Sequence, residues 1–349
     1  MHLSSLRYLK RTILLAALTA AGFCFGASGT VYVADEGSNS VSIIDVTTLK
    51  KIGKIVVGLG LHNVQASPDG KLVWVTNNGE PSLSPGPMAN KNLPKVEHGG
   101  MTGPGAVWAI GTATASVVSK VPVGSQPTHV VLTRDGRTAF ITNGGDNTVS
   151  MVDTAALQVV ETIAVGESPH GLRISADGKQ VWVANLEGTT VSVIDVGSRK
   201  QIDQIEVGKG PAQVAFTPDS RFGFVTLSKE NAVAVVDFGR RKLIQKIAVG
   251  TVPIQLYSTP DSQFILVANQ GSKEKPGKTI SIVEVAKLKE VSTIKTGAGT
   301  HGIVVDQAGR LAFVTNTYAN TVSVINIANR RVISTIAVGT EPNGITITP

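Results

Sequence analysis

Histidine is the residue whose type and spacing in this sequence could do chemistry beyond packing. His62, His170 and His301 each lie four residues after the glycine of a recurring Val-Gly or equivalent element, and His129 lies five residues after its own. Imidazole nitrogens bind Zn, Cu, Fe or Ni and exchange protons near neutral pH. If the repeats close into a ring, these four side chains would surround one opening. We therefore predict a ligand or metal site there.

Further polar residues extend this candidate site. At the same positions of other repeats the sequence has Gln213, Gln255 and Asn343, which we include as ligand-binding candidates. His98 lies in a long insertion that is expected to open onto the same face, and Glu97 beside it could bind a metal through oxygen or orient an imidazole ring. The candidate cofactor is a transition metal, Cu, Zn or Fe, and its candidate ligands are His62, His129, His170, His301, His98 and Glu97.

A second interpretation of these histidines stays open. The repeats arose by copying, and His170 and His301 stand in similar settings, Pro169-His170-Gly171 and Thr300-His301-Gly302. An inherited histidine could cap a turn without binding anything. Both interpretations depend on the elements that carry these residues.

Those elements are seven copies of one repeat. Its glycine occurs at 58, 124, 166, 208, 250, 297 and 339, so that the spacings are 66, 42, 42, 42, 47 and 42 residues. Two insertions explain the departures from 42, and the longer one, in repeat two, covers 78–104. It is rich in Pro and Gly without periodicity, so we expect an irregular loop, which could act as a lid over the histidines.

Each repeat predicts four short strands. Val, Ile, Ser and Thr alternate as in half-buried strands, and Asp-Gly and related pairs mark the hairpin turns. The segment after the N-terminal region, Val31–Asp35, has the sequence of a second strand, whereas Asn343–Thr348 has that of a first strand. The expected fold is all-β: a seven-bladed β-propeller of four-stranded antiparallel blades, in which the C-terminal innermost strand joins the N-terminal blade and closes the ring.

The second strand carries a recurring motif. It occurs as Tyr32-Val-Ala-Asp35, Trp74-Val-Thr-Asn77, Phe140-Ile-Thr-Asn143, Trp182-Val-Ala-Asn185, Phe224-Val-Thr-Leu227, Leu266-Val-Ala-Asn269 and Phe313-Val-Thr-Asn316. This motif resembles the YVTN-family (YncE-like) β-propeller repeat, and the resemblance covers 30–349 apart from the insertions. The resemblance implies the fold; it implies little about function, because the family includes surface, periplasmic and cofactor-associated proteins. We expect the aromatic residue to pack between blades and the asparagine to cap a turn.

The N-terminal segment differs in kind from the repeats. Arg7, Lys10 and Arg11 precede a short apolar run and then small residues, which predicts a signal peptide over 1–29. Its cleavage would remove Cys24, the only cysteine, and lower the formal charge from +7 to +4. We expect a periplasmic or secreted monomer without a transmembrane span, because no later run of apolar residues is long enough to cross a bilayer.

Three functions are consistent with these features. The first is an exported propeller that binds a small-molecule or protein partner at the histidine mouth without catalysis. The second is a metal-dependent hydrolase or oxidoreductase that uses the same histidines. The third uses the opposite face, whose turns carry many Lys and Arg, such as Arg240, Arg241 and Lys242, to bind an anionic polymer or a membrane surface. Nucleotide-binding loops and hydrolase motifs do not occur in the sequence.

Overall fold

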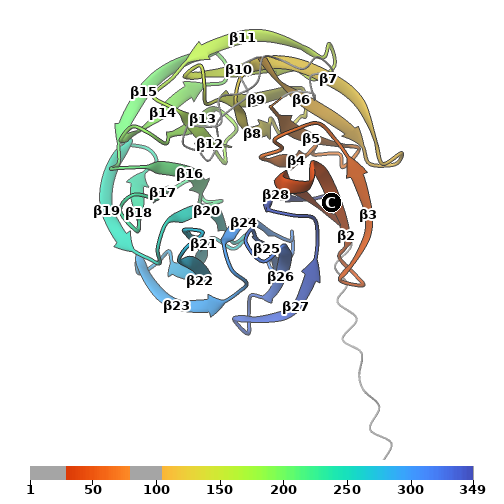
Figure 1. Cartoon of the computed structure of the whole chain (residues 1–349). Coiled ribbons are helices and arrows are strands. Elements are labelled where there is room, and N and C mark those ends of the chain that lie inside the picture. The colour runs from red at the N-terminus through yellow and green to blue at the C-terminus, as the bar shows by residue number, and fades with distance from the viewer. Residues whose placement is uncertain (1–28, 79–103, 349) are drawn as a thin grey trace, which may run out of the picture.

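The computed structural model describes residues 29–78 and 104–348, in which seven four-stranded antiparallel sheets are arranged in a ring around a central channel (Figure 1). This is a seven-bladed β-propeller, as the repeat predicted. In each blade the strand order follows the chain from the channel outward, and only the first blade departs from this rule. The expected lid and the residues His98 and Glu97 lie outside the described residues.

The strands are short and regular. The innermost strands are β28 (Pro342–Ile347), β4 (Val64–Ala66), β8 (Pro127–Leu132), β12 (Pro169–Ile174), β16 (Pro211–Phe216), β20 (Pro253–Ser258) and β24 (Thr300–Val305). The second strands are β1 (Thr30–Asp35), β5 (Leu72–Asn77), β9 (Thr138–Asn143), β13 (Gln180–Asn185), β17 (Phe222–Leu227), β21 (Phe264–Gly271) and β25 (Leu311–Asn316). The third strands are β2 (Ser40–Asp45), β6 (Pro104–Gly111), β10 (Thr148–Asp153), β14 (Thr190–Asp195), β18 (Ala232–Asp237), β22 (Pro276–Glu284) and β26 (Thr321–Asn326). The outermost strands are β3 (Lys50–Val56), β7 (Ser116–Ser125), β11 (Gln158–Ala164), β15 (Lys200–Glu206), β19 (Lys242–Ala248), β23 (Lys289–Lys295) and β27 (Arg331–Ala337). One 3₁₀ turn, η1 (Glu36–Ser38), joins β1 to β2.

The ring closes through the first blade. β28 pairs antiparallel with β1, with Tyr32 opposite Thr346 and Val33 opposite Ile345, so strands from the two ends of the described chain share one sheet. This confirms the expected closure and gives the first blade its fourth strand. The closing strand also places Asn343 beside η1, which matters for the site below.

Aromatic side chains of the second strands fill the space between blades. Trp182 on β13 is fully buried, and its ring lies edge-on to Phe216 of the next blade with centroids 5.0 Å apart. A Cβ atom on Gly223 of that blade would approach the indole to 2.6 Å, so glycine allows the close contact. Apolar clusters of this kind span neighbouring blades around the ring. The predicted role of the aromatic residue is confirmed.

The asparagine that ends the second strand caps the following hairpin. In β13 the Asn185 Nδ2 donates to Thr190 Oγ1 at 2.9 Å and to Ser192 Oγ at 3.1 Å. A Cβ atom at Gly166 would overlap this amide. The repeat glycine and the asparagine therefore occur together because the backbone passes directly over the buried amide. Asn143, Asn269 and Asn316 make the same pair of hydrogen bonds in their own blades.

Six of the seven innermost strands contain a bulge near their start, and only the short strand β4 pairs without one. On β12, Pro169 lies opposite Asn185 but Leu172 lies opposite Val183, so one extra residue is inserted between them. The same irregularity recurs on β8, β16, β20, β24 and β28. A bulge interrupts the alternation of side chains between the two faces of a strand. Neighbouring positions of the repeat can therefore both turn toward the channel.

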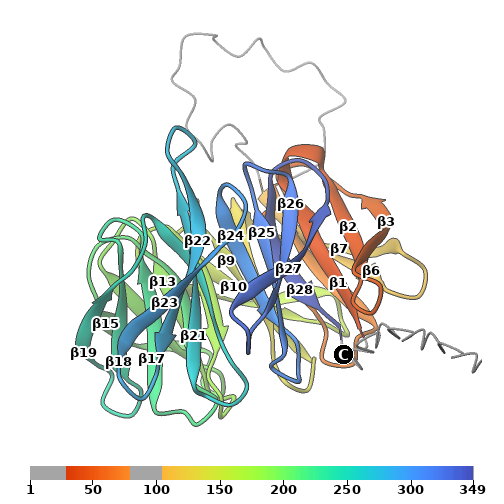
Figure 2. The same ribbon diagram turned by 90° about the horizontal axis from the view of Figure 1, so that it is seen from below.

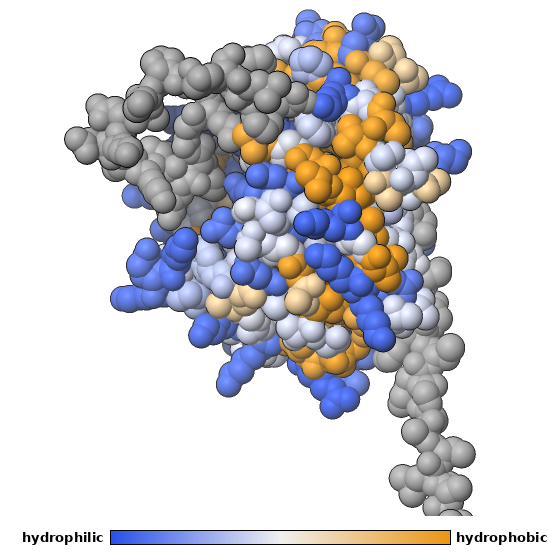
Figure 3. All heavy atoms as spheres, turned by 45° about the vertical axis from the view of Figure 1, so that its right-hand side comes forward, coloured by the Kyte–Doolittle hydropathy of each residue, from blue (hydrophilic) through white to orange (hydrophobic). Residues whose placement is uncertain are grey.

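The two faces and the rim of the disc differ. The β21–β22 hairpin is longer than its counterparts and extends beyond the other blades on one face (Figure 2), where we expected the shorter insertion, Gly271–Lys278. Apolar side chains lie exposed on the rim formed by β3 and β7 (Figure 3), among them Ile52, Val56 and Val118. In the part of the chain with described coordinates, no helix has the length and apolar character needed to cross a membrane.

Candidate functional site

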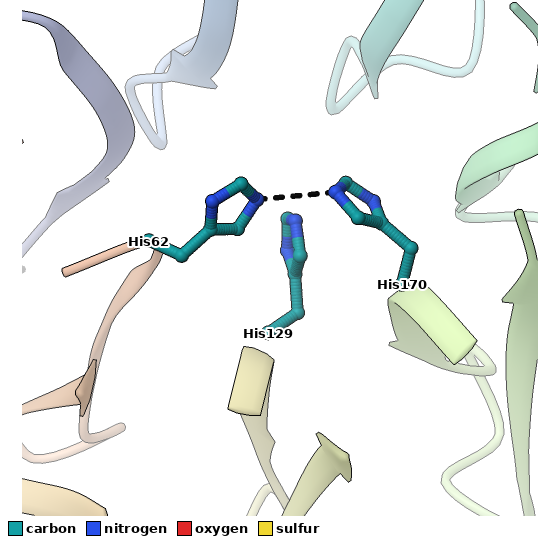
Figure 4. A group of neighbouring side chains, drawn as sticks. All are labelled: His62, His129 and His170. Carbon is teal, nitrogen blue, oxygen red and sulfur yellow. Dashed lines mark hydrogen bonds between the residues drawn. The ribbon is translucent and has the colours of Figure 1, made fainter. Parts of the chain in front are cut away.

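Three of the predicted histidines meet at one end of the channel. His62 lies just before β4, His129 is on β8 and His170 is on β12, and their side chains point toward one another (Figure 4). They are 2–6% exposed, and one nitrogen from each lies within 4.8 Å of the others. The Nε2 atoms of His62 and His170 are 3.1 Å apart. We call this group the histidine cluster and the end of the channel that holds it the histidine mouth.

Hydrogen bonding orients the ring of His170. Its Nδ1 lies 2.9 Å from the carbonyl oxygen of Ala212, which can only accept, so Nδ1 carries the proton and donates. The neutral ring then presents an unprotonated Nε2 to the cluster. A backbone carbonyl behind Nδ1 is the usual support of a metal-binding histidine.

A carboxylate lies behind the ring of His62. The Nδ1 of His62 is 3.8 Å from Glu36 Oε2, which is ion-pair distance but too long for a hydrogen bond. Asn343 Nδ2 donates to that same Glu36 oxygen. The closing strand β28 therefore fixes the carboxylate that faces His62. No sequence motif links Glu36 to His62, and the two residues meet because neighbouring blades place them on the same face.

His129 lies deepest and has a different environment. Gln213 Oε1 accepts a hydrogen bond from the Val214 amide at 2.9 Å, which turns Gln213 Nε2 toward His129 Nδ1 at 3.3 Å. Because an amide nitrogen only donates, Nδ1 accepts and the proton of the neutral ring is on Nε2. Burial lowers the pKa of His129 well below its ordinary value, and the neighbouring His170 and His62 lower it further. This ring is therefore neutral at physiological pH.

The spacing of the cluster suits one metal ion. Two nitrogen ligands at about 2.0–2.1 Å from a tetrahedral ion are about 3.3 Å from each other. The 3.1 Å between the Nε2 atoms of His62 and His170 is close to that value. His129 can present a free Nε2 only when its proton is on Nδ1, which requires the Gln213 amide to turn over. Because His170 Nε2 is unprotonated, His62 Nε2 donates across this contact, and its proton would have to move to Nδ1, which faces Glu36, before both nitrogens could bind an ion. His129 needs the further rearrangement of Gln213.

The remaining predicted residues are placed as follows. His301 is buried beside the cluster, with its ring centroid 6.1 Å from that of His62. Gln213 contacts His129, and Asn343 contacts Glu36 rather than a histidine. Gln255 is buried in the channel wall, and among the described residues its Nε2 has no hydrogen-bond partner. The structure brings together His62, His129 and His170, with Gln213 behind one ring.

The channel continues from the cluster toward the other face. A cavity of about 70 Å³ is lined by His129, Gln213 and Gln255 at one end and by Arg173 and Tyr257 further in. We call it the channel cavity. It borders two wider pockets that open on the opposite face, because Tyr257 lines all three.

The basic opposite face is partly neutralised by its own acids. Arg241 lies 3.3 Å from Asp203, Arg221 lies 2.7 Å from Asp219, and further ion pairs join Lys71 to Asp69, Arg240 to Asp237 and Lys287 to Glu284. Exposed pairs of this kind reduce the field that an anionic polymer would meet. The histidine cluster is therefore the stronger candidate for a functional site.

Solved structures share the fold at low sequence identity. A hydrazine synthase of Kuenenia stuttgartiensis is 19% identical over 82% of this chain and 88% of that chain, with a TM-score of 0.67. A protein of unknown function from Desulfotomaculum acetoxidans is 16% identical over 92% of this chain and 99% of that chain, with a TM-score of 0.72. The dihydro-haem d1 dehydrogenase NirN is 14% identical over 91% of this chain and 74% of that chain, with a TM-score of 0.65. At these identities the likeness concerns the fold alone.

Sequence comparison adds the family. Comparison with curated proteins gave no match. The model of the YncE-like β-propeller family matches residues 133–221 and 212–348, which together are more than half of the chain. The matched ranges include His170, His301 and Gln213. His62 and His129 lie before the first matched residue. The chain belongs to the YncE-like β-propeller family.

Proposed function

We propose that the protein is an exported propeller that binds a transition-metal ion, Cu, Zn or Fe, at the histidine mouth. His62 and His170 supply Nε2 ligands, and His129 supplies the third nitrogen after its proton moves to Nδ1. The observation that carries this proposal is the convergence of three buried imidazoles from three blades, with two Nε2 atoms 3.1 Å apart. Imidazole is the ligand that these metals share.

The groups behind the rings favour a metal over a structural role. A turn-capping histidine would donate to the backbone of its own turn, whereas His170 donates to Ala212 of the next blade. Glu36 faces His62 from the first blade. A carboxylate behind an imidazole makes that imidazole a stronger metal ligand. Both supports turn Nε2 toward the shared centre. Inheritance of a repeat explains a histidine at each position, but it does not explain the different support of each ring.

Three protein nitrogens would leave a coordination position for a small ligand. Structural zinc sites use four protein ligands, whereas sites that act on small molecules keep one position open. In this protein the position would face the histidine mouth or the channel cavity below His129. The proposed function is therefore binding of a metal together with a small molecule or partner group at this mouth.

Metal analysis of the full chain, purified without chelators from the native compartment, tests the proposal. We expect one ion per chain, lost in His62→Asn and His170→Ala. Two other repeats already carry Asn343 and Ala212 at this position, so neither substitution should prevent folding. His301→Asn is the matched control, because it removes a buried histidine that lies further from the centre, and this variant should keep the ion. A folded, metal-free wild type that also fails to take up Cu, Zn or Fe would reject the proposal.

Export has its own test. The basic, apolar and small-residue segments within 1–29 support it. N-terminal sequencing of the protein from the periplasmic or extracellular fraction should begin near Thr30. A protein found only in the cytoplasm with residue 1 intact would reject export without affecting the metal proposal.

A further inference from the structure

Arg173 is a charged side chain inside the channel. It lies three residues after His170 on β12 and lines the channel cavity from the side away from the histidines. The other six blades have uncharged residues at this position of the innermost strand: Gln65, Val131, Ala215, Tyr257, Val304 and Thr346. Arg173 thus provides the single formal charge of this ring of residues.

This guanidinium has no anionic partner in the protein as described. Within 29–78 and 104–348 no carboxylate lies at ion-pair distance from Arg173, and no hydrogen bond to its side chain occurs. The ring of Tyr257 lies beside it, with its centroid 5.4 Å from the guanidinium carbon. Burial lowers the pKa of Arg173, but a guanidinium keeps its charge in proteins. Arg173 is half-buried and lines open space, so its charge can meet an anion that enters from solvent.

Arg173 also lines a pocket that could hold such an anion. The pocket has a volume of about 350 Å³ and opens on the face opposite the histidine mouth. Its polar wall has Arg173, Tyr257 and, at the exposed rim, Arg134; its apolar wall includes Phe216, Pro218 and Pro260. None of its described lining residues is acidic. We call it the arginine pocket.

We propose that the arginine pocket binds an organic acid, with the carboxylate on Arg173 and the hydrocarbon part against Phe216 and Pro218. A guanidinium offers two parallel N–H donors to a carboxylate, which fixes the orientation of the acid. The volume is within the range of small-molecule sites, and two cationic groups above an apolar wall match an amphipathic anion. This site is separate from the histidine cluster and from the ion-paired turns of the same face, because its described lining includes neither a histidine nor an acidic residue.

Isothermal titration calorimetry of the full chain with octanoate tests this site. Octylammonium, which has the same hydrocarbon length and the opposite charge, is the matched ligand control. We expect octanoate to bind at one site and octylammonium not to bind. Arg173→Gln should lower the octanoate affinity at least about tenfold, Arg173→Lys should lower it less, and Arg134→Gln should have a small effect because it is exposed.

Arg137→Gln is the matched protein control. Arg137 is an exposed cation on a neighbouring turn that does not line the pocket, so its loss should leave the affinity unchanged. Thermal melting of each variant establishes that it is folded. Absence of octanoate binding up to its solubility limit, equal binding of octylammonium, or full affinity in folded Arg173→Gln would each overturn the proposal. Since His62→Asn should bind octanoate normally, failure here and failure of the metal site are distinguishable.

Discussion

The Nε2 atoms of His62 and His170 lie 3.1 Å apart although 108 residues separate them in the chain. His129, from the blade between them, completes the group. No local motif could produce this contact, because each ring comes from a different copy of the repeat. The circular arrangement of the copies brings the three together, and the support behind each ring determines which nitrogen faces the centre.

Gln213→Glu should strengthen metal binding. A carboxylate oxygen in place of the amide nitrogen would accept a proton from His129 Nδ1 and leave Nε2 free as a ligand. We expect the metal dissociation constant to fall about tenfold, measured by competition with a chromophoric chelator. Gln255→Glu is the control, since this residue occupies the equivalent position of the next blade and, among the described residues, its Nε2 bonds no histidine. An unchanged or weaker constant in Gln213→Glu would contradict the proposed role of His129.

The metal-free protein should lose stability in mild acid partly through His129. Its folded-state pKa is well below that of the unfolded chain because of burial, so unfolding takes up a proton. The free energy of unfolding should therefore decrease as pH falls below about 6.5, by up to about 1.4 kcal/mol per pH unit. Urea titrations at several pH values between about 5 and about 8, the range in which histidine titrates, measure this slope. His129→Gln should reduce the slope, and an equal slope in the two proteins would contradict the prediction.

Asp35→Asn should stabilise the protein at neutral pH. Asp35 takes the place of the capping asparagine in the first blade, is fully buried, and accepts hydrogen bonds from Ser42 at 2.5 Å and Ser40 at 3.3 Å. Burial raises the pKa of Asp35 more than the Ser42 hydrogen bond lowers it. For a raised carboxyl pKa, stability is greatest in acid and is lost as pH rises through the folded-state value.

The gain in melting temperature from Asp35→Asn should accordingly grow as pH increases. Asn316→Asp provides the reverse experiment at the equivalent position, where Asn316 donates to Thr321 and Ser323. It should cost about 1–3 kcal/mol at neutral pH. Opposite signs for the two substitutions are expected; destabilisation by both at neutral pH would show that Asp35 has a role beyond capping.

Leu227→Asn should destabilise the fifth blade, and two further substitutions should restore it. Leu227 stands where other blades have asparagine, and the residues facing it are Ala232 and Ala234 instead of a hydroxyl pair. An amide there would lack its partners, at a cost of about 1–3 kcal/mol. Adding Ala232→Thr and Ala234→Ser supplies them. Denaturant titration should show a favourable coupling between the substitutions, and strict additivity would contradict the capping model.

Much of the fold followed from the repeat because each feature of it has one physical role. The repeat glycine and the asparagine occur together because the glycine backbone lies against the asparagine amide that caps the turn, as Gly166 and Asn185 show. The first-strand sequence near the C-terminus predicted the pairing of β28 with β1. These relationships are local or lie between neighbouring strands, so the sequence alone carries them.

The site was less accessible to prediction for a geometric reason. His129 and His170 occupy different positions of the repeat, and simple strand alternation would send them to opposite faces; the bulge in β12 and β8 lets both reach the centre. Glu36 faces His62 from the neighbouring blade, and Asn343 of the closing strand β28 holds its carboxylate there. Arg173 could have been found by aligning the innermost strands, where it is the one charged residue in its column.

The pairing of β28 with β1 also means that the first blade can complete its fold only after β28 has been synthesised. Thr30 and Thr348 hydrogen-bond across 318 positions of the chain, so the first blade remains three-stranded until the seventh has been synthesised. Contacts of such long range form slowly, and an unfilled strand position can accept the same strand from another molecule. Exchange of β28 between two chains would join two discs without altering either histidine cluster, and concentration during refolding would govern how many such dimers arise.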